Sequence, residues 1–470
     1  MAIGPPSRRG AALVGLSLAL SVLLAGAWSP SAVGSSPLTT LVSVASDGTQ
    51  ADFPSADPST SADGRLVAFD TSAANLVPGD TNAFGDVFVR DRQAGETTRV
   101  SLASDGTQGN EGSALPAISA DGRFVAFVSG ATNLVPGDTN PLVDVFVHDR
   151  QTGQTTRVNV ASDGTQAGGI GASYGSAKPS ISADGRYVAF DTDASNLVPG
   201  DTNTCASLPN VPPGACPDVF VHDLQTGQTT RVSVAADGTQ GNDQSFRPAI
   251  SADGRYVAFV SLASNLVPGD TNGALDIFVH DRQTGQTTRV SVASDGTQGN
   301  RDSAFPTVSA DGRYVAFVSD ASNLVPGDTN GRRAAYLGED IFVRDRQTGQ
   351  TTRVSVAFNQ RQARGPSLQP SISASGRLVA FTSAASNLVP GDTNRIPDVF
   401  VRDRQTETTV RASVASDGTQ ATGDAGLFDS SFDPSISADG RSVAFTSSAT
   451  NLVPGDANRV NDVFARELAP

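Results

Sequence analysis

The chain has 470 residues and a formal net charge of −15, with 38% hydrophobic and 17% charged residues. This hydrophobic content, together with 47 Gly and 27 Pro, is more typical of a folded, turn-rich all-β protein than of a disordered one. Nucleic acids and anionic membrane surfaces attract basic proteins, so the acidic balance argues against both as partners.

The N-terminus has the pattern of an export signal. Arg8 and Arg9 precede an apolar run from Ala11 to Ala25, and Ala25-Gly-Ala27 places small residues at a cleavage position. We therefore expect a signal peptide at 1–27, a short linker at 28–37 and a folded domain at 38–470. The apolar run is too short for a comfortable membrane span and no Cys follows it, which predicts a secreted or extracytoplasmic protein without a lipid anchor or a transmembrane segment.

The rest of the chain is a repeat. An Asp-Gly-Arg turn, or Ser-Gly-Arg once, recurs at intervals of 58 to 69 residues, beginning at Asp63, Asp121, Asp184, Asp253, Asp311, Ser375 and Asp439. In the clearest copy, residues 247–298, four runs rich in β-branched and aromatic residues lie at 248–251, 255–261, 276–281 and 287–293. Turn residues separate these runs, so each predicts a strand, and four such strands make one blade of a β-propeller.

The two ends of the chain complete each other. The seventh unit stops after its third strand, at 462–470, whereas residues 39–50 match the fourth strand of the other units and precede the first unit. Pairing Leu41 to Ala45 with the blade of residues 434–466 closes the ring and removes two exposed sheet edges. We predict an all-β, seven-bladed β-propeller with four-stranded antiparallel blades and 1+3 closure by the N-terminal strand.

The text of the repeat resembles that of a known family. S-A-D-G-R-Y-V-A-F-V-S, followed by D-I-F-V-H-D and T-T-R-V-S, is similar to the repeat of TolB-like, WD-repeat-like propellers over essentially the whole mature chain. That family usually has Pro where Ala252 stands here. TolB itself has an additional N-terminal domain without a counterpart in this chain, so the resemblance implies the propeller but not the partners of TolB. Many members of the family are binding platforms or carry a peptidase domain.

Loop lengths indicate which face of the propeller carries the functional site. The separation from the Asp-Gly turn to the Asp of the next loop is 17 residues in every copy, as from Asp63 to Asp80. Insertions occur only between the second and third strands and between the fourth strand and the next unit. Those two loop types emerge on the same face of an antiparallel blade, and variable loops usually carry binding.

The loop between the second and third strands repeats the pattern D-x-N-x-x-x-D. Oxygen ligands at this spacing suit Ca²⁺, but Asp and Asn also build Asx-turns and cap strands, and both interpretations remain open. The complete copies, our candidate metal ligands, are Asp80, Asn82 and Asp86; Asp138, Asn140 and Asp144; Asp270, Asn272 and Asp276; Asp392, Asn394 and Asp398; and Asp456, Asn458 and Asp462.

Residues that are not repeated deserve separate attention, because an active site normally occurs once in a chain. Cys205 and Cys216 lie in one insertion of an exported chain and predict a disulfide. The three histidines, His148, His222 and His280, occupy a strand position that carries Arg in other copies, and we expect them to be solvated. The candidate contact residues in the variable loops are Tyr174, Lys178, Arg332, Arg333, Tyr336 and Glu339.

These patterns favour a non-enzymatic, monomeric binding or scaffold protein outside the cytoplasm. Its acidic, insertion-bearing face would contact an unidentified protein or extracellular ligand, with calcium as the one cofactor considered and no catalytic residue nominated. The alternative is a hydrolase or lyase that acts on an extracellular polymer at the central opening. An enzyme should show an unrepeated cluster of acid, base and nucleophile lining that opening, whereas a binder should show only decorated loops.

Overall fold

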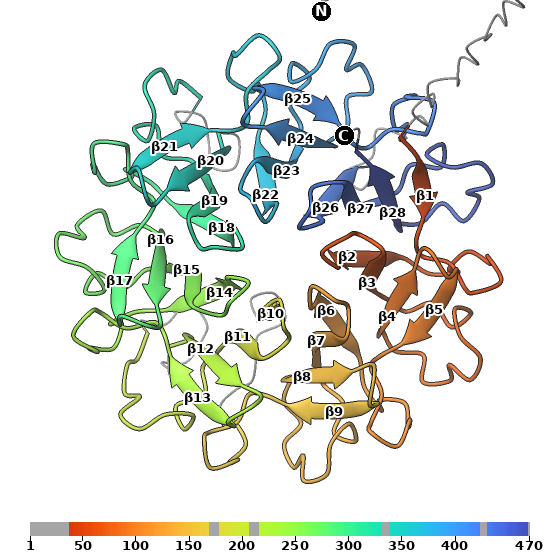
Figure 1. The fold of residues 1–470 in the computed structure, drawn as a ribbon, viewed down its shortest axis with the longest axis horizontal. Helices are drawn as coiled ribbons and strands as arrows, with labels where there is room; N and C mark the ends of the chain where they lie inside the picture. The colour runs from red at the N-terminus through yellow and green to blue at the C-terminus, as the bar shows by residue number, and fades with distance from the viewer. Residues whose placement is uncertain (1–36, 169–177, 206–215, 331–337, 424–429, 469–470) are drawn as a thin grey trace, which may run out of the picture. The chain divides into compact units, whose positions relative to one another are not determined.

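The computed structural model describes residues 37–168, 178–205, 216–330, 338–423 and 430–468. These residues form seven four-stranded antiparallel sheets arranged around a central axis (Figure 1). The predicted fold class is therefore confirmed. The expected signal peptide, 1–27, lies outside the described residues and stays a prediction, and so do all but Pro37 of the expected linker.

Each blade runs from an innermost strand at the axis to an outermost strand at the rim. The innermost strands are β2 (Ser55–Thr60), β6 (Ser113–Ile118), β10 (Ser180–Ile181), β14 (Ser245–Ile250), β18 (Ser303–Val308), β22 (Ser367–Ile372) and β26 (Ser431–Ile436). The second strands are β3 (Leu66–Thr71), β7 (Phe124–Ser129), β11 (Tyr187–Thr192), β15 (Tyr256–Ser261), β19 (Tyr314–Ser319), β23 (Leu378–Ser383) and β27 (Ser442–Ser447). The third strands are β4 (Asp86–Asp91), β8 (Asp144–Asp149), β12 (Asp218–Asp223), β16 (Asp276–Asp281), β20 (Asp340–Asp345), β24 (Asp398–Asp403) and β28 (Asp462–Glu467). The outermost strands are β5 (Glu96–Arg99), β9 (Gln154–Arg157), β13 (Gln228–Arg231), β17 (Gln286–Arg289), β21 (Gln350–Arg353), β25 (Thr408–Arg411) and β1 (Thr39–Leu41).

The innermost strands differ from the sequence prediction in an instructive way. Strand β14 begins at Ser245 and not at Pro248, because its register to β15 shifts between Phe246 and Ala249. This β-bulge places Arg247 and Pro248 together opposite one residue of β15, so the missing N–H of the proline costs no ladder hydrogen bond. The same shift occurs in the innermost strands of five other blades.

The core lies between neighbouring blades. The second and third strands are buried on both faces, which explains their continuous runs of Val, Ala, Ile and Phe. In every blade a Phe of the second strand stacks on a Phe of the third, as Phe69 does on Phe88, with ring centroids 5.9 to 6.0 Å apart. Each buried Phe contributes roughly 1.5–3 kcal/mol relative to an exposed one, so the blades adhere face to face through these rings.

The turns between innermost and second strands also join the blades. Gly254 has a φ of +72°, and a Cβ placed on it would lie 2.1 Å from Cδ2 of Tyr187 in the preceding blade. The Tyr187 ring itself lies between two guanidinium groups, with Cζ of Arg186 at 4.7 Å and Cζ of Arg282 at 4.4 Å from its centroid. The glycine of the repeat is therefore required both by the turn and by the close approach of the next blade.

Closure of the ring is as predicted. Strand β1 pairs antiparallel with β28, with Thr39 opposite Arg466 and Leu41 opposite Phe464. Just beyond the strand, Ser43 Oγ donates a hydrogen bond of 2.6 Å to Asp462 Oδ1. The N-terminal strand thus completes the last blade.

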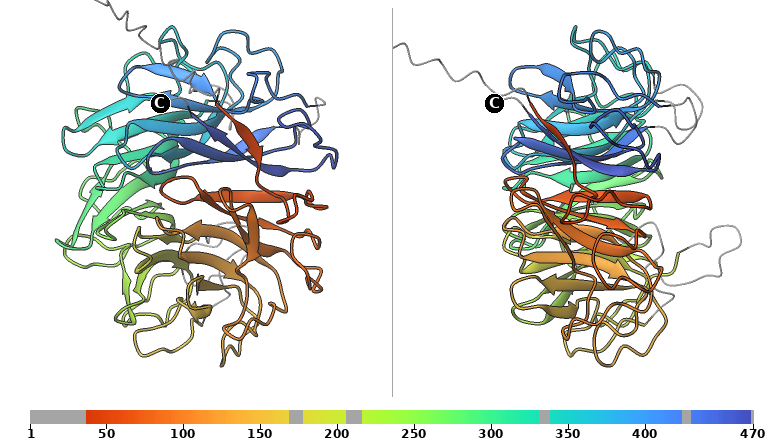
Figure 2. Two further views of the ribbon diagram at one scale, coloured as in Figure 1. Left: turned by 45° about the vertical axis from the view of Figure 1, so that its right-hand side comes forward. Right: turned by 90° about the vertical axis from the view of Figure 1, so that its right-hand side faces the viewer.

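The two faces of the disc are built differently (Figure 2). On the face that carries the Asp-Gly turns, a backbone hydrogen bond links each blade to the next, from Ala62 N to Ala120 O at 2.9 Å and onward to Asp439 N, which donates to Ala62 O at 3.0 Å. This closed circle of hydrogen bonds explains why loop lengths on that face do not vary. We call it the turn face, and the opposite face, where the Asp–Asn loops between second and third strands lie, the loop face.

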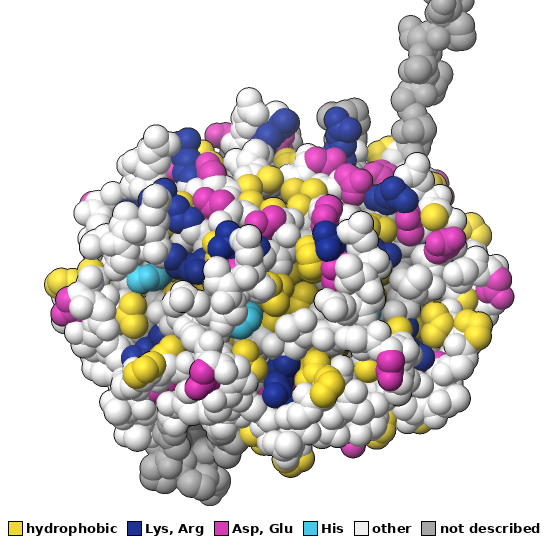
Figure 3. All heavy atoms as spheres, turned by 60° about the horizontal axis from the view of Figure 1, so that its bottom comes forward, with side chains coloured by type: hydrophobic (Ala, Val, Ile, Leu, Met, Phe, Trp, Pro, Cys, Tyr) yellow, Lys and Arg dark blue, Asp and Glu magenta, His cyan; other side chains and the backbone are white. Residues whose placement is uncertain are grey.

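The protein surface in Figure 3 carries basic and acidic side chains interspersed rather than in a patch of one sign. Part of this mixture comes from Arg–Asp pairs that join the turns of a blade, such as Arg65 Nη2 with Asp91 Oδ2 at 2.6 Å. No helix within the described part of the chain has the length and hydropathy needed to cross a membrane.

Candidate functional site in the central cavity

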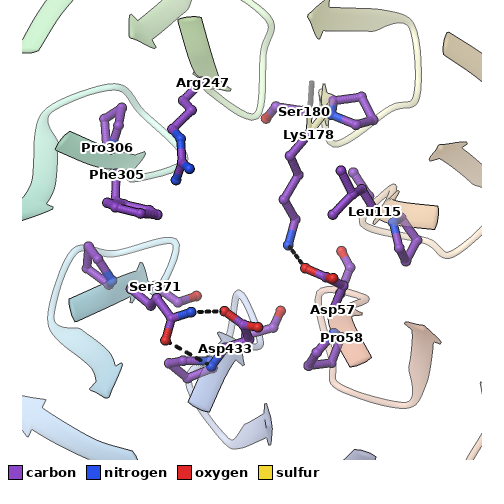
Figure 4. Close-up of a pocket in the computed structure, with 18 of the residues that line it drawn as sticks. Asp57, Pro58, Leu115, Lys178, Ser180, Arg247, Phe305, Pro306, Ser371 and Asp433 are labelled. Carbon is purple, nitrogen blue, oxygen red and sulfur yellow. Dashed lines mark hydrogen bonds and ion pairs between the residues drawn. The ribbon is translucent and has the colours of Figure 1, made fainter. Parts of the chain in front are cut away.

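A cavity of about 580 Å³ lies on the axis of the propeller, and the innermost strands line it. Every repeat has a proline at the same place in this strand, and the residue before the proline contributes to the cavity wall (Figure 4). We call these seven residues the cavity ring. In blade order they are Asp57, Leu115, Lys178, Arg247, Phe305, Gln369 and Asp433.

The β-bulge explains why this position faces the cavity. Six members of the cavity ring have a left-handed backbone conformation, with φ of 51° at Asp57, 54° at Arg247 and 49° at Asp433, for example. Non-glycine residues rarely adopt this conformation, which costs energy and is kept where the surrounding structure enforces it. Proline after the ring residue also disfavours the ordinary helical conformation there. The blade therefore presents one side chain to the axis, and this position varies more between blades than the others in the strand.

Acidic and basic side chains meet on one side of the ring. Lys178 extends from the start of β10 towards Asp57, with Nζ 3.3 Å from Asp57 Oδ1 (Figure 4). Asp433, in the blade next to that of Asp57, receives a hydrogen bond from the amide of Gln369. The Gln369 Oε1 atom in turn accepts hydrogen bonds from Asp433 N at 3.3 Å and from Thr382 Oγ1 at 3.0 Å. Gln369 thus fixes both the backbone and the carboxyl of Asp433.

The environment of Asp433 favours the protonated form of its carboxyl group. Burial raises the pKa of Asp433 to about 6, and the negative charge of Asp57 acts in the same direction. The positive charges of Lys178 and Arg247 oppose this shift without cancelling it. A carboxyl group whose pKa is raised in this way can act as a general acid.

Two further carboxyl groups lie behind the ring, on second strands. Asp70 and Asp191 stand where the other repeats have Val or Thr, and each accepts a hydrogen bond from the backbone N–H of a ring residue in the next blade. The distances are 2.8 Å from Leu115 N to Asp70 and 3.1 Å from Arg247 N to Asp191. Burial raises the pKa of both carboxyl groups to about 8.

The other side of the ring combines a cation with an aromatic ring. The guanidinium Cζ of Arg247 lies 3.9 Å from the centroid of the Phe305 ring (Figure 4). Burial lowers the pKa of Arg247, whereas Asp191 and Asp433 raise it. An arginine remains charged under such shifts, so the cavity holds a fixed cation across from Asp57 and Asp433.

The predicted metal ligands of the loop face are already engaged by nitrogen donors. In the first copy, Arg99 Nη1 lies 3.3 Å from both Asp80 Oδ1 and Asp86 Oδ2, and Gln108 Nε2 donates to the same carboxylates at 2.7 and 3.1 Å. Asn82 forms an Asx-turn, since its Oδ1 accepts a hydrogen bond from Phe84 N at 3.0 Å. The equivalent arginines of the next five copies are Arg157, Arg231, Arg289, Arg353 and Arg411.

The alternative interpretation of these loops, turn formation, therefore accounts for their Asp and Asn residues. A cation would have to displace a guanidinium from between the carboxylates in six of the seven copies. In the seventh, Gln50 Nε2 alone bridges Asp456 and Asp462, at 2.8 Å from each. We do not propose calcium at these loops.

The structure also describes the two cysteines and two of the six candidate contact residues. Cys205 and Cys216 form the expected disulfide, which is consistent with an extracytoplasmic location. Of the contact residues, Tyr174, Arg332, Arg333 and Tyr336 lie outside the described residues, Glu339 is half-buried, and Lys178 lies in the cavity.

The histidines are buried, whereas we expected them to be solvated. Each Nδ1 lies 2.9 Å from a Thr Oγ1, as His148 does from Thr155. Arginines at the same position in other copies donate to the equivalent Thr, for example Arg90 to Thr97 at 3.1 Å. Either side chain thus serves the same structural hydrogen bond, and the residues have no part in the cavity.

The cavity ring was missed in the sequence although a signal for it exists. The residue before the strand proline takes six identities in seven copies, with Asp alone occurring twice, whereas the other positions of the strand vary among a few small, hydroxyl or apolar residues. A position that varies within a conserved unit is where a repeat protein can place an unrepeated site. Loop lengths, which indicate the variable face, contain no information about variation of a single residue within a strand.

No protein-family model and no curated protein sequence matches the chain. Among solved structures, an oligogalacturonate lyase in complex with manganese is similar at 14% identity, with a TM-score of 0.52 over 92% of this chain and 96% of that chain. The oligogalacturonate lyase of Vibrio parahaemolyticus is similar at 13% identity, with a TM-score of 0.53 over 92% and 97%. TolB from Acinetobacter baumannii is 18% identical over 76% of this chain and 63% of that chain, with a TM-score of 0.38.

At these identities the similarity of the two lyase structures shows the fold alone, a β-propeller as the repeat predicts. The prediction of a non-enzymatic binding or scaffold protein is wrong. The two lyase structures match nine-tenths of the chain, and the central opening is lined by two carboxyl groups and two cations that differ from the residues at the same position in most other blades. The comparisons and the cavity together favour the alternative, a polymer-degrading lyase or hydrolase with its site at the central opening.

Proposed function

We propose that this protein is an extracytoplasmic lyase that cleaves a uronate-containing polysaccharide in the central cavity. The observation that carries the proposal is the cavity ring. Seven blades of nearly identical sequence place two carboxyl groups, two cations, an amide, an aromatic ring and a leucine at one equivalent position. A structural role would favour the same residue in each blade, whereas an active site needs different groups converging on one point.

Elimination requires a base, an acid and a cation, and the ring supplies each. Asp57 takes the proton from the sugar carbon next to the uronate carboxylate, and the electrons of that C–H bond form a double bond to the adjacent ring carbon. The bond from that carbon to the bridging oxygen breaks, and Asp433 donates its proton to the departing oxygen. Lys178, paired with Asp57, stabilises the negative charge that develops on the uronate carboxylate.

The fold neighbours support this chemistry by class only. Their names identify enzymes that act on oligogalacturonate, and one is a manganese complex. The described residues of this chain do not offer a comparable metal site in the cavity. Their one group of three metal-ligating side chains is Cys205, Cys216 and Asp243, where the two sulfur atoms are joined in a disulfide. We therefore assign no step to a metal.

Product analysis tests the proposal. Purified protein is incubated with trigalacturonate, and the expected product contains a carbon–carbon double bond that is detected by ultraviolet absorbance and mass. Asp433→Asn should reduce kcat by about 100-fold or more, since it removes a general acid. Glu96→Gln, the same acid-to-amide change on the exposed strand β5, should leave kcat unchanged. Saturated products would contradict elimination, and full activity of Asp433→Asn would contradict the site.

A further inference from the structure

Arg247, Asp191 and Phe305 form a unit that the elimination step does not use. Arg247 and Phe305 are not repeated at their position in another described blade, Asp191 has its one counterpart in Asp70, and the three residues come from three successive blades, on β11, β14 and β18. The ring order places Arg247 directly after Lys178 and across the axis from Asp57 and Asp433. The cavity therefore has a second cation outside the cluster of acid and base.

This second cation is held in place from two sides. Asp191 is only 3% exposed. Its carboxyl group accepts the hydrogen bond from Arg247 N and so stabilises the left-handed backbone conformation of Arg247. Phe305 stacks against the guanidinium and sets its plane. Burying a carboxyl group is costly, and five repeats avoid that cost with Val or Thr at the equivalent position. The arrangement is that of a positioned ligand-binding group.

The chemistry of the guanidinium identifies its ligand. A planar fork of N–H donors with a fixed orientation matches a carboxylate, to which it can donate two parallel hydrogen bonds. Lys178 and Arg247 lie on adjacent blades of one cavity of about 580 Å³, which is in the range of sites that bury a small ligand. Two cations at neighbouring positions fit two carboxylates carried by neighbouring sugar units.

We infer that Arg247 binds the carboxylate of a second uronate, so that the substrate class is an oligosaccharide of consecutive uronate units. This inference rests on the proposed function for the identity of the ligand as a saccharide. Asp191 and Phe305 are positioning residues for Arg247. A polymer in which acidic and neutral sugars alternate would leave Arg247 without its carboxylate and would bind more weakly.

Binding measured apart from catalysis tests the inference. Isothermal titration calorimetry is done with the Asp433→Asn protein, whose turnover is expected to be at least about 100-fold slower, using trigalacturonate and its fully methyl-esterified form. Adding Arg247→Ala should weaken trigalacturonate binding by about 10- to 100-fold, because a charge-assisted hydrogen bond is lost. Binding of the ester should change little. Arg441→Ala removes an arginine that is 78% exposed at a turn and should have no effect.

A second pair of variants separates positioning from folding. Asp191→Asn keeps an oxygen that accepts from Arg247 N and should retain binding, whereas Asp191→Val should weaken binding of the acid but not of the ester. Arg247→Lys keeps the charge without the fork and should fall between the parent and Arg247→Ala. These variants remain informative if Arg247→Ala does not fold.

The outcomes distinguish this inference from the proposed function. If Arg247→Ala binds trigalacturonate as tightly as its parent, or if acid and ester bind equally well, Arg247 is not a carboxylate site. If the binding pattern is as expected but the wild-type protein cleaves nothing, the carboxylate site stands and the lyase assignment falls. If the wild-type protein neither binds nor cleaves trigalacturonate, both are refuted.

Discussion

Replacing Asp191 by Asn should increase the free energy of unfolding at alkaline pH and leave it unchanged at acid pH. Burial raises the pKa of Asp191 from 3.8 to about 8, so the folded protein retains a proton there that the unfolded chain has lost. Stability from this group is fully present below about pH 4 and is lost progressively as the pH rises towards 8. At about 1.4 kcal/mol per pKa unit, the loss at pH 8 is on the order of 5 kcal/mol.

The assay is urea denaturation of wild type and Asp191→Asn between pH 4 and pH 8. The difference in the free energy of unfolding should be near zero at pH 4 and should grow in favour of the variant as the pH rises. Asp191→Val should gain less, because it leaves Arg247 N without an acceptor, at a cost of roughly 1–3 kcal/mol. Glu96→Gln serves as the control. A difference that is independent of pH, or that favours wild type at pH 8, would show that the pKa of Asp191 is not raised in the folded protein.

Three further predictions concern the blade, the loops and the acid. Gly254→Ala should lower the free energy of unfolding, measured by urea denaturation, by about 2–4 kcal/mol, because the added methyl group overlaps with Tyr187. The control is Gly238→Ala, where φ is +84° and no atom lies within 4 Å of the added Cβ, and it should cost only about 1–2 kcal/mol. Equal losses in the two variants would contradict the contact between blades. The melting temperature should be the same in excess Ca²⁺ and in chelator, because arginine and glutamine nitrogens already occupy the Asp–Asn loops; a clear rise with Ca²⁺ would restore the metal interpretation. Turnover should decline as the pH rises through about 6, where Asp433 loses its proton, and a rate that increases over this range would exclude Asp433 as the acid.

The scaffold is predictable because the sequence repeats the same four-stranded unit seven times. Alternating strands and Asp-Gly turns are local features, and the unmatched strand at each end determines the closure that β1 and β28 show. The disulfide follows from two cysteines in one exported insertion. These properties depend on patterns that a single sequence repeats or counts.

The site was harder to predict because its members are far apart in the sequence and ordinary in type. Asp57 and Asp433 are neighbours only after the ring closes, and Lys178 was assigned to a variable loop although it reaches the axis. The Asp–Asn loops attracted attention because they are acidic and repeated, but a repeated carboxylate beside a repeated Arg, such as Asp86 beside Arg99, is structural pairing. Functional residues here are the exceptions to the repeat.

The most direct test of the account is the crystal structure of the Asp433→Asn protein with trigalacturonate. We expect the saccharide to lie in the central cavity, with one carboxylate at Lys178, a second at Arg247 and its glycosidic bond facing Asp57 and residue 433. A saccharide bound on the outer loops of the loop face, with the cavity ring uncontacted, would contradict the claim that the unrepeated ring residues are the active site.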